Sequence, residues 1–127
     1  SRARVSQQQK TLWNLCFALG NIFSAAKQGR DHVVWPSCII IDLTQVIVDN
    51  KNFKCRINAA SALLQLDVLP ETIQERWQTE FYPNIEKVLE SLLSIKVSSS
   101  MKADVLKKYK KTLQKLIERI LKSFGTS

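Results

Sequence analysis

The sequence is poor in the residues that usually build catalytic or metal centres, and it has no long apolar run. It contains three glycines, three prolines, three cysteines and a single histidine, His32, among 127 residues. The longest apolar run, 15–19, is far shorter than the ~20 residues that a membrane-spanning helix needs. No signal-peptide pattern begins at Ser1. With 45% apolar residues, the chain predicts one compact domain with a hydrophobic core and no membrane span.

The cysteines form neither a metal-binding nor a catalytic pattern. Cys16, Cys38 and Cys55 lie 22 and 17 residues apart, whereas a structural zinc site needs four cysteine or histidine ligands in close pairs. No local motif supports a Cys–His nucleophile pair with His32, and the sequence has no glycine-rich phosphate loop or GxSxG motif. We therefore expect no cofactor, no metal and no enzymatic activity. Buried free thiols would suit a reducing compartment, so we expect an intracellular protein, cytoplasmic or nuclear.

A net charge of +8 is the strongest compositional feature, and it is concentrated at the two ends of the chain. Residues 1–30 carry +5 and residues 101–127 carry +6, whereas residues 31–70 carry −1 and residues 71–100 carry −2. Such asymmetry is compatible with a nucleic-acid partner, an acidic protein partner or a well-solvated surface. Composition alone does not choose between these three.

The hydrophobic periodicity predicts an all-α domain, in which helices are separated by short turns. Ser6 and Gln9 fit a capping box, which predicts that the first helix begins at residue 6. Tyr82 and Pro83 are expected to bend or break a later helix, because proline cannot donate a backbone hydrogen bond. The predicted helices are 6–28, 36–48, 53–66, a helix opened by Pro70, 85–95 and 102–124, with a turn at 49–52 and a polar loop at 97–100.

Two of the predicted helices share a sequence pattern. A period of about 40–47 residues with two helices per unit is typical of HEAT and armadillo repeats. In this chain four residues recur after 44 positions, and the pairs are Lys10 and Lys54, Asn14 and Asn58, Ala18 and Ala62, and Leu19 and Leu63.

Residues 36–66 resemble a HEAT repeat over their whole length. Pro36 starts the first helix, Asp49 lies in the turn, Arg56 opens the second helix, and residues 59–63 (AASAL) match the AAxAL stretch of the family. The resemblance implies a short right-handed α-solenoid of antiparallel helix pairs, an armadillo-like superhelix. Residues 1–127 would then form one solenoid fragment, with a second-type helix (6–28), a HEAT-like unit (36–66) and a degenerate C-terminal capping unit (70–124). The first unit lacks its first helix and the third lacks the Asp/Arg turn, so Asp49 and Arg56 are expected to be a local structural pair.

The resemblance also implies that the second helices line a concave surface. Polar stripes at helical spacing predict three parts of such a surface, with Phe17 as its aromatic anchor. Two alternatives stay open, because lysines opposite an apolar stripe also solubilise a capping helix and Phe17 also suits packing against a neighbouring helix. Trp13, Trp35 and Trp77 are interpreted as packing residues in preference to a ligand cage. The candidate partner-binding residues are Lys10, Asn14, Phe17 and Asn21; Lys54, Asn58, Ser61 and Gln65; and Lys108, Lys111, Lys115, Arg119 and Lys122.

These observations predict a non-catalytic scaffold that binds another protein through an acidic or mixed segment. The alternative is a nucleic-acid-binding helical module that uses the basic terminal helices. Without an opening helix in the first unit, residues 12–23 would expose apolar surface. We therefore expect either self-association through this N-terminal edge or an N-terminal segment that covers it.

Overall fold

The computed structural model describes residues 2–29, 35–66, 71–93 and 103–125, and every regular element in these ranges is helical. The all-α prediction is therefore confirmed. The polar loop predicted at 97–100, the helix start at Pro70 and the surroundings of His32 lie outside the described residues. The elements are α1 (Arg2–Gln28), α2 (Ser37–Asp49), α3 (Phe53–Leu64), α4 (Glu71–Arg76), the π-helical turn η1 (Trp77–Phe81), α5 (Tyr82–Leu93) and α6 (Ala103–Gly125).

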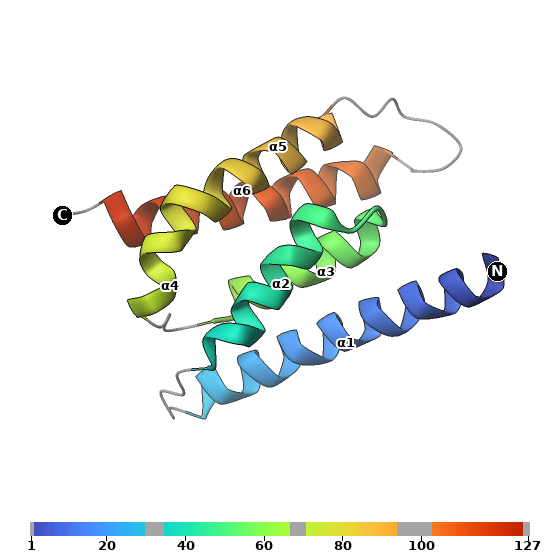
Figure 1. Cartoon of the computed structure of the whole chain (residues 1–127), viewed down its shortest axis with the longest axis horizontal. Helices are drawn as coiled ribbons and strands as arrows, with labels where there is room; N and C mark the ends of the chain where they lie inside the picture. The colour runs from blue at the N-terminus through green and yellow to red at the C-terminus, as the bar shows by residue number, and fades with distance from the viewer. Residues whose placement is uncertain (1, 30–34, 67–70, 94–102, 126–127) are drawn as a thin grey trace.

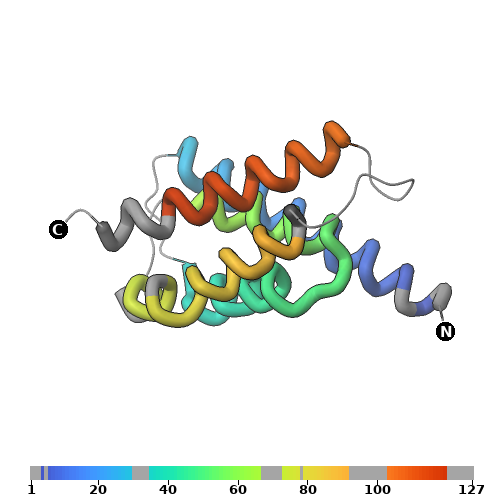
Figure 2. The backbone as a smooth tube through the Cα atoms, turned by 90° about the horizontal axis from the view of Figure 1, so that it is seen from above, coloured from blue at the N-terminus to red at the C-terminus, as the bar shows by residue number. Residues whose placement is uncertain are grey.

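The helices form two layers that share one hydrophobic core. Helices α2 and α5 lie in front of α3 and α6 in Figure 1, and the view from above in Figure 2 separates the same two layers. Helix α3 contacts α2, α6 and the long helix α1, which lies at one edge of the molecule. The largest fully buried side chains come from all these helices and include Phe23, Ile40, Leu63, Trp77 and Leu113.

The first helix begins earlier than the capping box predicts. Helix α1 starts at Arg2, so Ser6 lies inside the helix and does not cap it. The residues before Ser6 are Arg2, Ala3, Arg4 and Val5, and arginine and alanine are among the strongest helix formers. Nothing in this stretch breaks the helical hydrogen bonding, so the helix extends past the cap.

The turn between α2 and α3 is set by side chains that replace missing backbone partners. Asn52 is the N-cap of α3, and its Oδ1 accepts hydrogen bonds from the backbone N–H groups of Lys54 (2.9 Å) and Cys55 (3.3 Å). Asn50 Oδ1 accepts from the N–H of Asn52 at 2.8 Å. These bonds satisfy donors that the first turn of a helix leaves without intrahelical partners, and they fold α3 back antiparallel to α2.

The irregularity expected at Pro83 is a π-helical turn. Residues 77–81 adopt π-helical hydrogen bonding, and the N–H of Tyr82 donates to the carbonyl of Trp77. Pro83 has no N–H and its ring crowds the carbonyl four residues earlier, so one extra residue in the turn accommodates it without ending the helix. Helix α5 then runs on, and its buried residues Ile85 and Val88 face the core.

The three tryptophans are in packing environments. Trp77 is 1% exposed within the core, and the ring of Trp35 lies 5.0 Å from that of Phe23. The Nζ atom of Lys54 lies 3.2 Å above the ring of Trp13, a cation–π contact between α3 and α1. These contacts agree with packing roles for the tryptophans.

Candidate functional site

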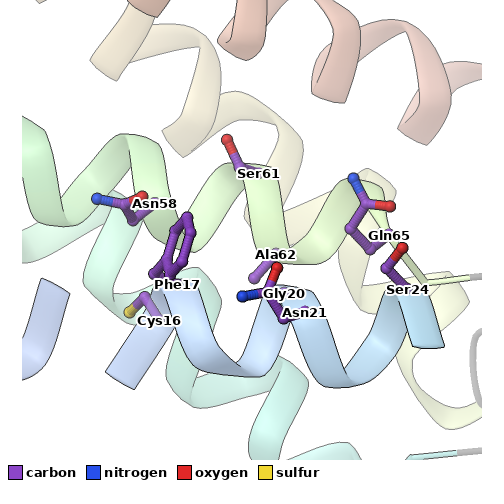
Figure 3. A pocket seen from close by; sticks show the side chains of 9 residues that line it. All are labelled: Cys16, Phe17, Gly20, Asn21, Ser24, Asn58, Ser61, Ala62 and Gln65. Carbon is purple, nitrogen blue, oxygen red and sulfur yellow. The ribbon is translucent and has the colours of Figure 1, made fainter. Parts of the chain in front are cut away.

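A pocket of about 210 Å³ opens between α1 and α3 (Figure 3). Five of the predicted partner-binding residues line it, drawn from both of the helices that share the 44-residue pattern. The structure thus brings together five predicted residues that are far apart in the chain. The pocket is lined by Cys16, Phe17, Gly20, Asn21, Ser24, Asn58, Ser61, Ala62 and Gln65.

The floor of the pocket exists because two small residues let the helices approach each other. A Cβ atom added to Gly20 would lie 3.4 Å from the Cα of Ala62 and 3.6 Å from its Cβ. Residues larger than alanine at either position would push α1 away from α3. The alanine-rich stretch of α3 therefore sets the distance between α1 and α3, the two helices that form the walls of the pocket.

The walls combine one exposed aromatic ring with uncharged polar groups. Phe17 is 59% exposed, and in Figure 3 it points from α1 toward α3 near Asn58, whereas Ser24 and Gln65 lie at the other end of the pocket. None of the residues that line the pocket carries a charge. Such a surface can contact an apolar side chain through Phe17 and form hydrogen bonds through amides and hydroxyls.

Three predicted residues on the same two helices lie outside the pocket lining. Lys10 and Asn14 are exposed on α1, and the ammonium group of Lys54 lies on the ring of Trp13. The side-chain N–H₂ of Asn58 donates to the backbone carbonyl of Lys54 at 2.9 Å. Lys54 and Asn58 are predicted partner-binding residues, and in the structure their side chains also make contacts within the protein.

The basic residues predicted on α6 separate into two groups. Lys108, Lys111 and Lys115 are exposed, as a solvated or binding face requires. Arg119 differs, because its guanidinium donates to the carbonyl oxygen of Leu64 at 2.7 Å and also to that of Leu66. The side chain of Lys122 lies outside the described residues.

Arg119 is therefore a correction to the predicted lysine face. The last carbonyls of a helix have no intrahelical donors, and a cation near them is favoured by the helix dipole. Arg119 meets both needs at the end of α3, so it joins α6 to α3 and does not point into water.

Arg56 holds the turn in a different way from the predicted pairing with Asp49. Its guanidinium donates to the backbone carbonyl of Asn50 and, at 3.4 Å, to that of Val48. Burial lowers the pKa of Arg56, and the nearby charge of Asp49 opposes this shift. The structural role predicted for Arg56 agrees with these contacts. Its hydrogen bonds go to the backbone, however, and the Asp49 carboxylate acts on it through charge alone.

The three cysteines differ in their burial. Cys16 and Cys55 are buried, and the thiol of Cys55 donates to the carbonyl oxygen of Gln9 at 3.3 Å. Burial, with a smaller effect from Cys55, raises the pKa of Cys16 from 9.0 to about 11, and burial also raises the pKa of Cys55. Cys38 is exposed, which corrects the expectation that all three thiols are buried.

The pocket thiol is poorly suited to nucleophilic chemistry. The reactive form of cysteine is the thiolate, and a pKa of about 11 leaves Cys16 almost entirely protonated near neutral pH.

Among the described residues, no group of three His, Cys, Asp or Glu side chains is arranged to share a metal ion. In the same ranges no helix has both the length and the apolar character of a membrane span.

Some pocket residues were missed by the sequence analysis. Cys16, Gly20, Ser24 and Ala62 line the pocket but are not among the predicted partner-binding residues. Helical spacing places Gly20 and Ser24 on the same side of α1 as Phe17, so a wider search along that face would have found them. The closeness of Gly20 to Ala62 depends on how α1 crosses α3, which the helical pattern does not contain.

Comparison with known proteins shows similarity to a protein of an amoeba. The chain is 32% identical over 120 residues to an uncharacterized protein of Dictyostelium discoideum, and the match covers 86% of this chain. The chain spans about 7% of the length of that relative. No protein-family model matches the sequence, and no solved structure matches it. The class that the fold defines is a two-layered all-α protein.

Proposed function

We propose that this chain is a HEAT-type α-solenoid segment, without catalytic activity, that binds another protein in the groove between α1 and α3. Three features support this proposal: the 44-residue pattern shared by α1 and α3, the antiparallel pairing of α2 with α3, and the layered packing of α5 and α6 onto that pair. Stacked helix pairs with an open face of second helices are the interaction surfaces of such repeats.

The observation that carries the binding proposal is the composition of the pocket. The pocket combines a ring that is 59% exposed with amides and hydroxyls from two helices, so it offers a partner both an apolar contact and hydrogen bonds. A volume of about 210 Å³ suits one bulky side chain, not a drug-sized ligand, which usually needs ~300–1,000 Å³.

The same composition refines the expected partner. Because the pocket is uncharged, it favours an extended segment with an apolar side chain that contacts Phe17 and with backbone groups that pair with Asn21, Asn58 and Gln65. An acidic segment would gain nothing within the pocket itself. We therefore propose a mixed segment whose central part is uncharged.

Selection from a phage-displayed library of random 12-residue peptides tests this proposal. We expect enriched peptides that share one aromatic or large aliphatic residue and that bind the purified chain in a fluorescence-polarisation assay. Phe17→Ala and Asn58→Ala should each weaken binding roughly tenfold, as ~1.4 kcal/mol of lost contact predicts. Gln45→Ala, at an exposed position of α2, is the matched control and should bind normally. Selected peptides that bind both pocket variants as tightly as the wild type would contradict the proposal.

The exposed lysines of α6 support nucleic-acid binding as the second candidate function. Lys107, Lys108, Lys110, Lys111 and Lys115 are all exposed, although Asp104 and Glu118 on the same helix are exposed too. Phosphate contacts predict affinity that falls steeply with salt. If binding of a 20-nucleotide single-stranded RNA at low salt is undiminished after Lys108, Lys111 and Lys115 are changed to Gln, this second function is wrong.

The proposed cellular location is the cytoplasm or nucleus. The exposed thiol of Cys38 supports it, because free surface thiols persist where the environment is reducing.

A further inference from the structure

In addition to the side that packs on the core, helix α1 carries an apolar stripe that the rest of the chain covers only in part. We define the α1 seam as Leu12, Leu15, Leu19, Ile22 and Ala26, whose spacing alternates between three and four residues. Leu15 is 54% exposed and Ile22 is 48% exposed, and the other three members are half-buried. This alternation is the pattern by which two helices pack along a coiled-coil contact.

The equivalent face of α3 shows what such a stripe requires. A shift of 44 residues takes Leu15, Leu19 and Ile22 to Ala59, Leu63 and Leu66. Ala59 and Leu63 of α3 and Leu66, which follows the end of that helix, are only 0%, 1% and 2% exposed. The face that is covered at these positions is therefore only partly covered in α1, which lies at the edge of the molecule in Figure 1.

The flanks of the seam allow another helix to approach closely. Ala18 and Ala25, on its outer side, are exposed and small. At about 100° per residue, Lys10 and Lys27 lie roughly 160° and 100° from the centre of the seam. Their charges therefore do not oppose contact with a second basic helix.

We infer that the α1 seam binds the α1 seam of a second copy of this chain, antiparallel and around a two-fold axis near Leu19. The seam is self-complementary in this arrangement, as a symmetric dimer requires. Leu15 of one copy meets Ile22 of the other, and the larger Leu12 meets the smaller Ala26. A parallel arrangement would place large residues on large residues, and alanine on alanine.

Sedimentation velocity across protein concentrations from 1 to about 200 μM tests the dimer. The wild type is expected to shift from monomer to dimer in this range, because a contact confined to one helix of each copy belongs with the small, weak interfaces. The double variant Leu15→Gln/Ile22→Gln should stay monomeric and keep its helical circular dichroism, because both positions are exposed.

Phe17→Gln is the matched control, since Phe17 is exposed on the same helix but about 180° from the centre of the seam. It should dimerise like the wild type, even though it removes the proposed peptide contact. A wild type that stays monomeric at 200 μM, or a dimer that Phe17→Gln disrupts as strongly as the double variant does, would overturn the inference.

Cysteine cross-linking tests the orientation. In a background with Cys38→Ser, Leu15→Cys and Ile22→Cys proteins are mixed and oxidised with copper–phenanthroline. Positions 15 and 22 lie about 10.5 Å apart along the helix, which exceeds the Cα separation that a disulfide allows. The antiparallel dimer therefore predicts a mixed 15–22 cross-link and little cross-linking in either protein alone. Efficient 15–15 cross-linking would show a parallel pair and contradict the assignment.

Discussion

Gly20 of α1 contacts Ala62 of α3 so closely that a Cβ on the glycine would lie 3.4 Å from the Ala62 Cα. This distance is an ordinary van der Waals contact and leaves room for a methyl group but for nothing larger. The two residues set the distance between the helices, and they also form the floor of the pocket.

The pair predicts opposite effects for two substitutions at residue 20. Gly20→Ala should stabilise the protein by up to about 1 kcal/mol, because alanine is the better helix former and its methyl group fits. Gly20→Val should destabilise it by about 1–3 kcal/mol, since its extra methyl groups must displace α3. Urea denaturation measures both, and a stabilised Gly20→Val variant would mean that the helices are not in close contact.

The contact of Arg119 with the end of α3 predicts an unusual cost for one basic residue on α6. Arg119→Met should lower the free energy of unfolding by about 1.5–3 kcal/mol, because the carbonyls of Leu64 and Leu66 lose a charged donor. Lys115→Met, at an exposed position on the same helix, should stay within about 0.5 kcal/mol of the wild type. Equal effects of the two substitutions in thermal or urea unfolding would show that Arg119 does not cap α3.

The turn between α2 and α3 predicts that Arg56 matters and Asp49 does not. Arg56→Gln should destabilise by about 1–3 kcal/mol, because it removes the donors to the carbonyls of Asn50 and Val48. Asp49→Asn should be neutral or slightly stabilising, since an exposed negative charge at the end of α2 opposes the helix dipole. If denaturation shows equal losses for both variants, the direct Asp–Arg pairing expected from the repeat resemblance holds instead.

The burial of the thiols predicts their reactivity. Ellman's reagent at pH 8 should label one cysteine of the native wild type quickly, and this residue should be Cys38. Cys38→Ser should remove the fast phase, whereas denaturant should expose the remaining two thiols. Fast labelling of two or three thiols in the native protein would show that α1 separates from α3 readily.

The raised pKa of Cys16 predicts a pH dependence of stability. The folded state holds the thiol proton more tightly than the unfolded state, so this stabilising contribution is complete below pH 9 and is lost as the pH rises through about 11. The wild type should therefore lose more stability than Cys16→Ala between pH 8.5 and 11. Parallel curves for the two proteins, measured by urea unfolding at each pH, would contradict this effect.

The sequence predicted much of the fold because its signals were local or periodic. The helices around Ile40, Leu63 and Leu113 follow apolar spacing that each segment carries by itself. Helical spacing and the 44-residue pattern also group Phe17, Asn21, Asn58, Ser61 and Gln65, and these five residues line one pocket.

The errors concern residues whose environment depends on another helix. Arg119 lies among lysines in the sequence, and only the position of α6 against α3 directs it to two carbonyls. Cys38 lies in an apolar run but is exposed, because α2 turns that side away from the core. The error at Ser6 is of a different kind, because it is local: the strong helix formers before Ser6 extend the helix past the predicted cap.

The amino-acid sequence by itself determined that this protein is helical, that two of its helices share residues 44 positions apart and that its charge lies at the ends. Helix formation follows from hydrogen bonds and side-chain periodicity within each segment, which local sequence specifies. The tertiary structure alone decided which apolar residues stay in water, which cation caps a helix and how deep the pocket is. These properties depend on the angle and distance between packed helices, and small contacts such as that of Gly20 with Ala62 set them.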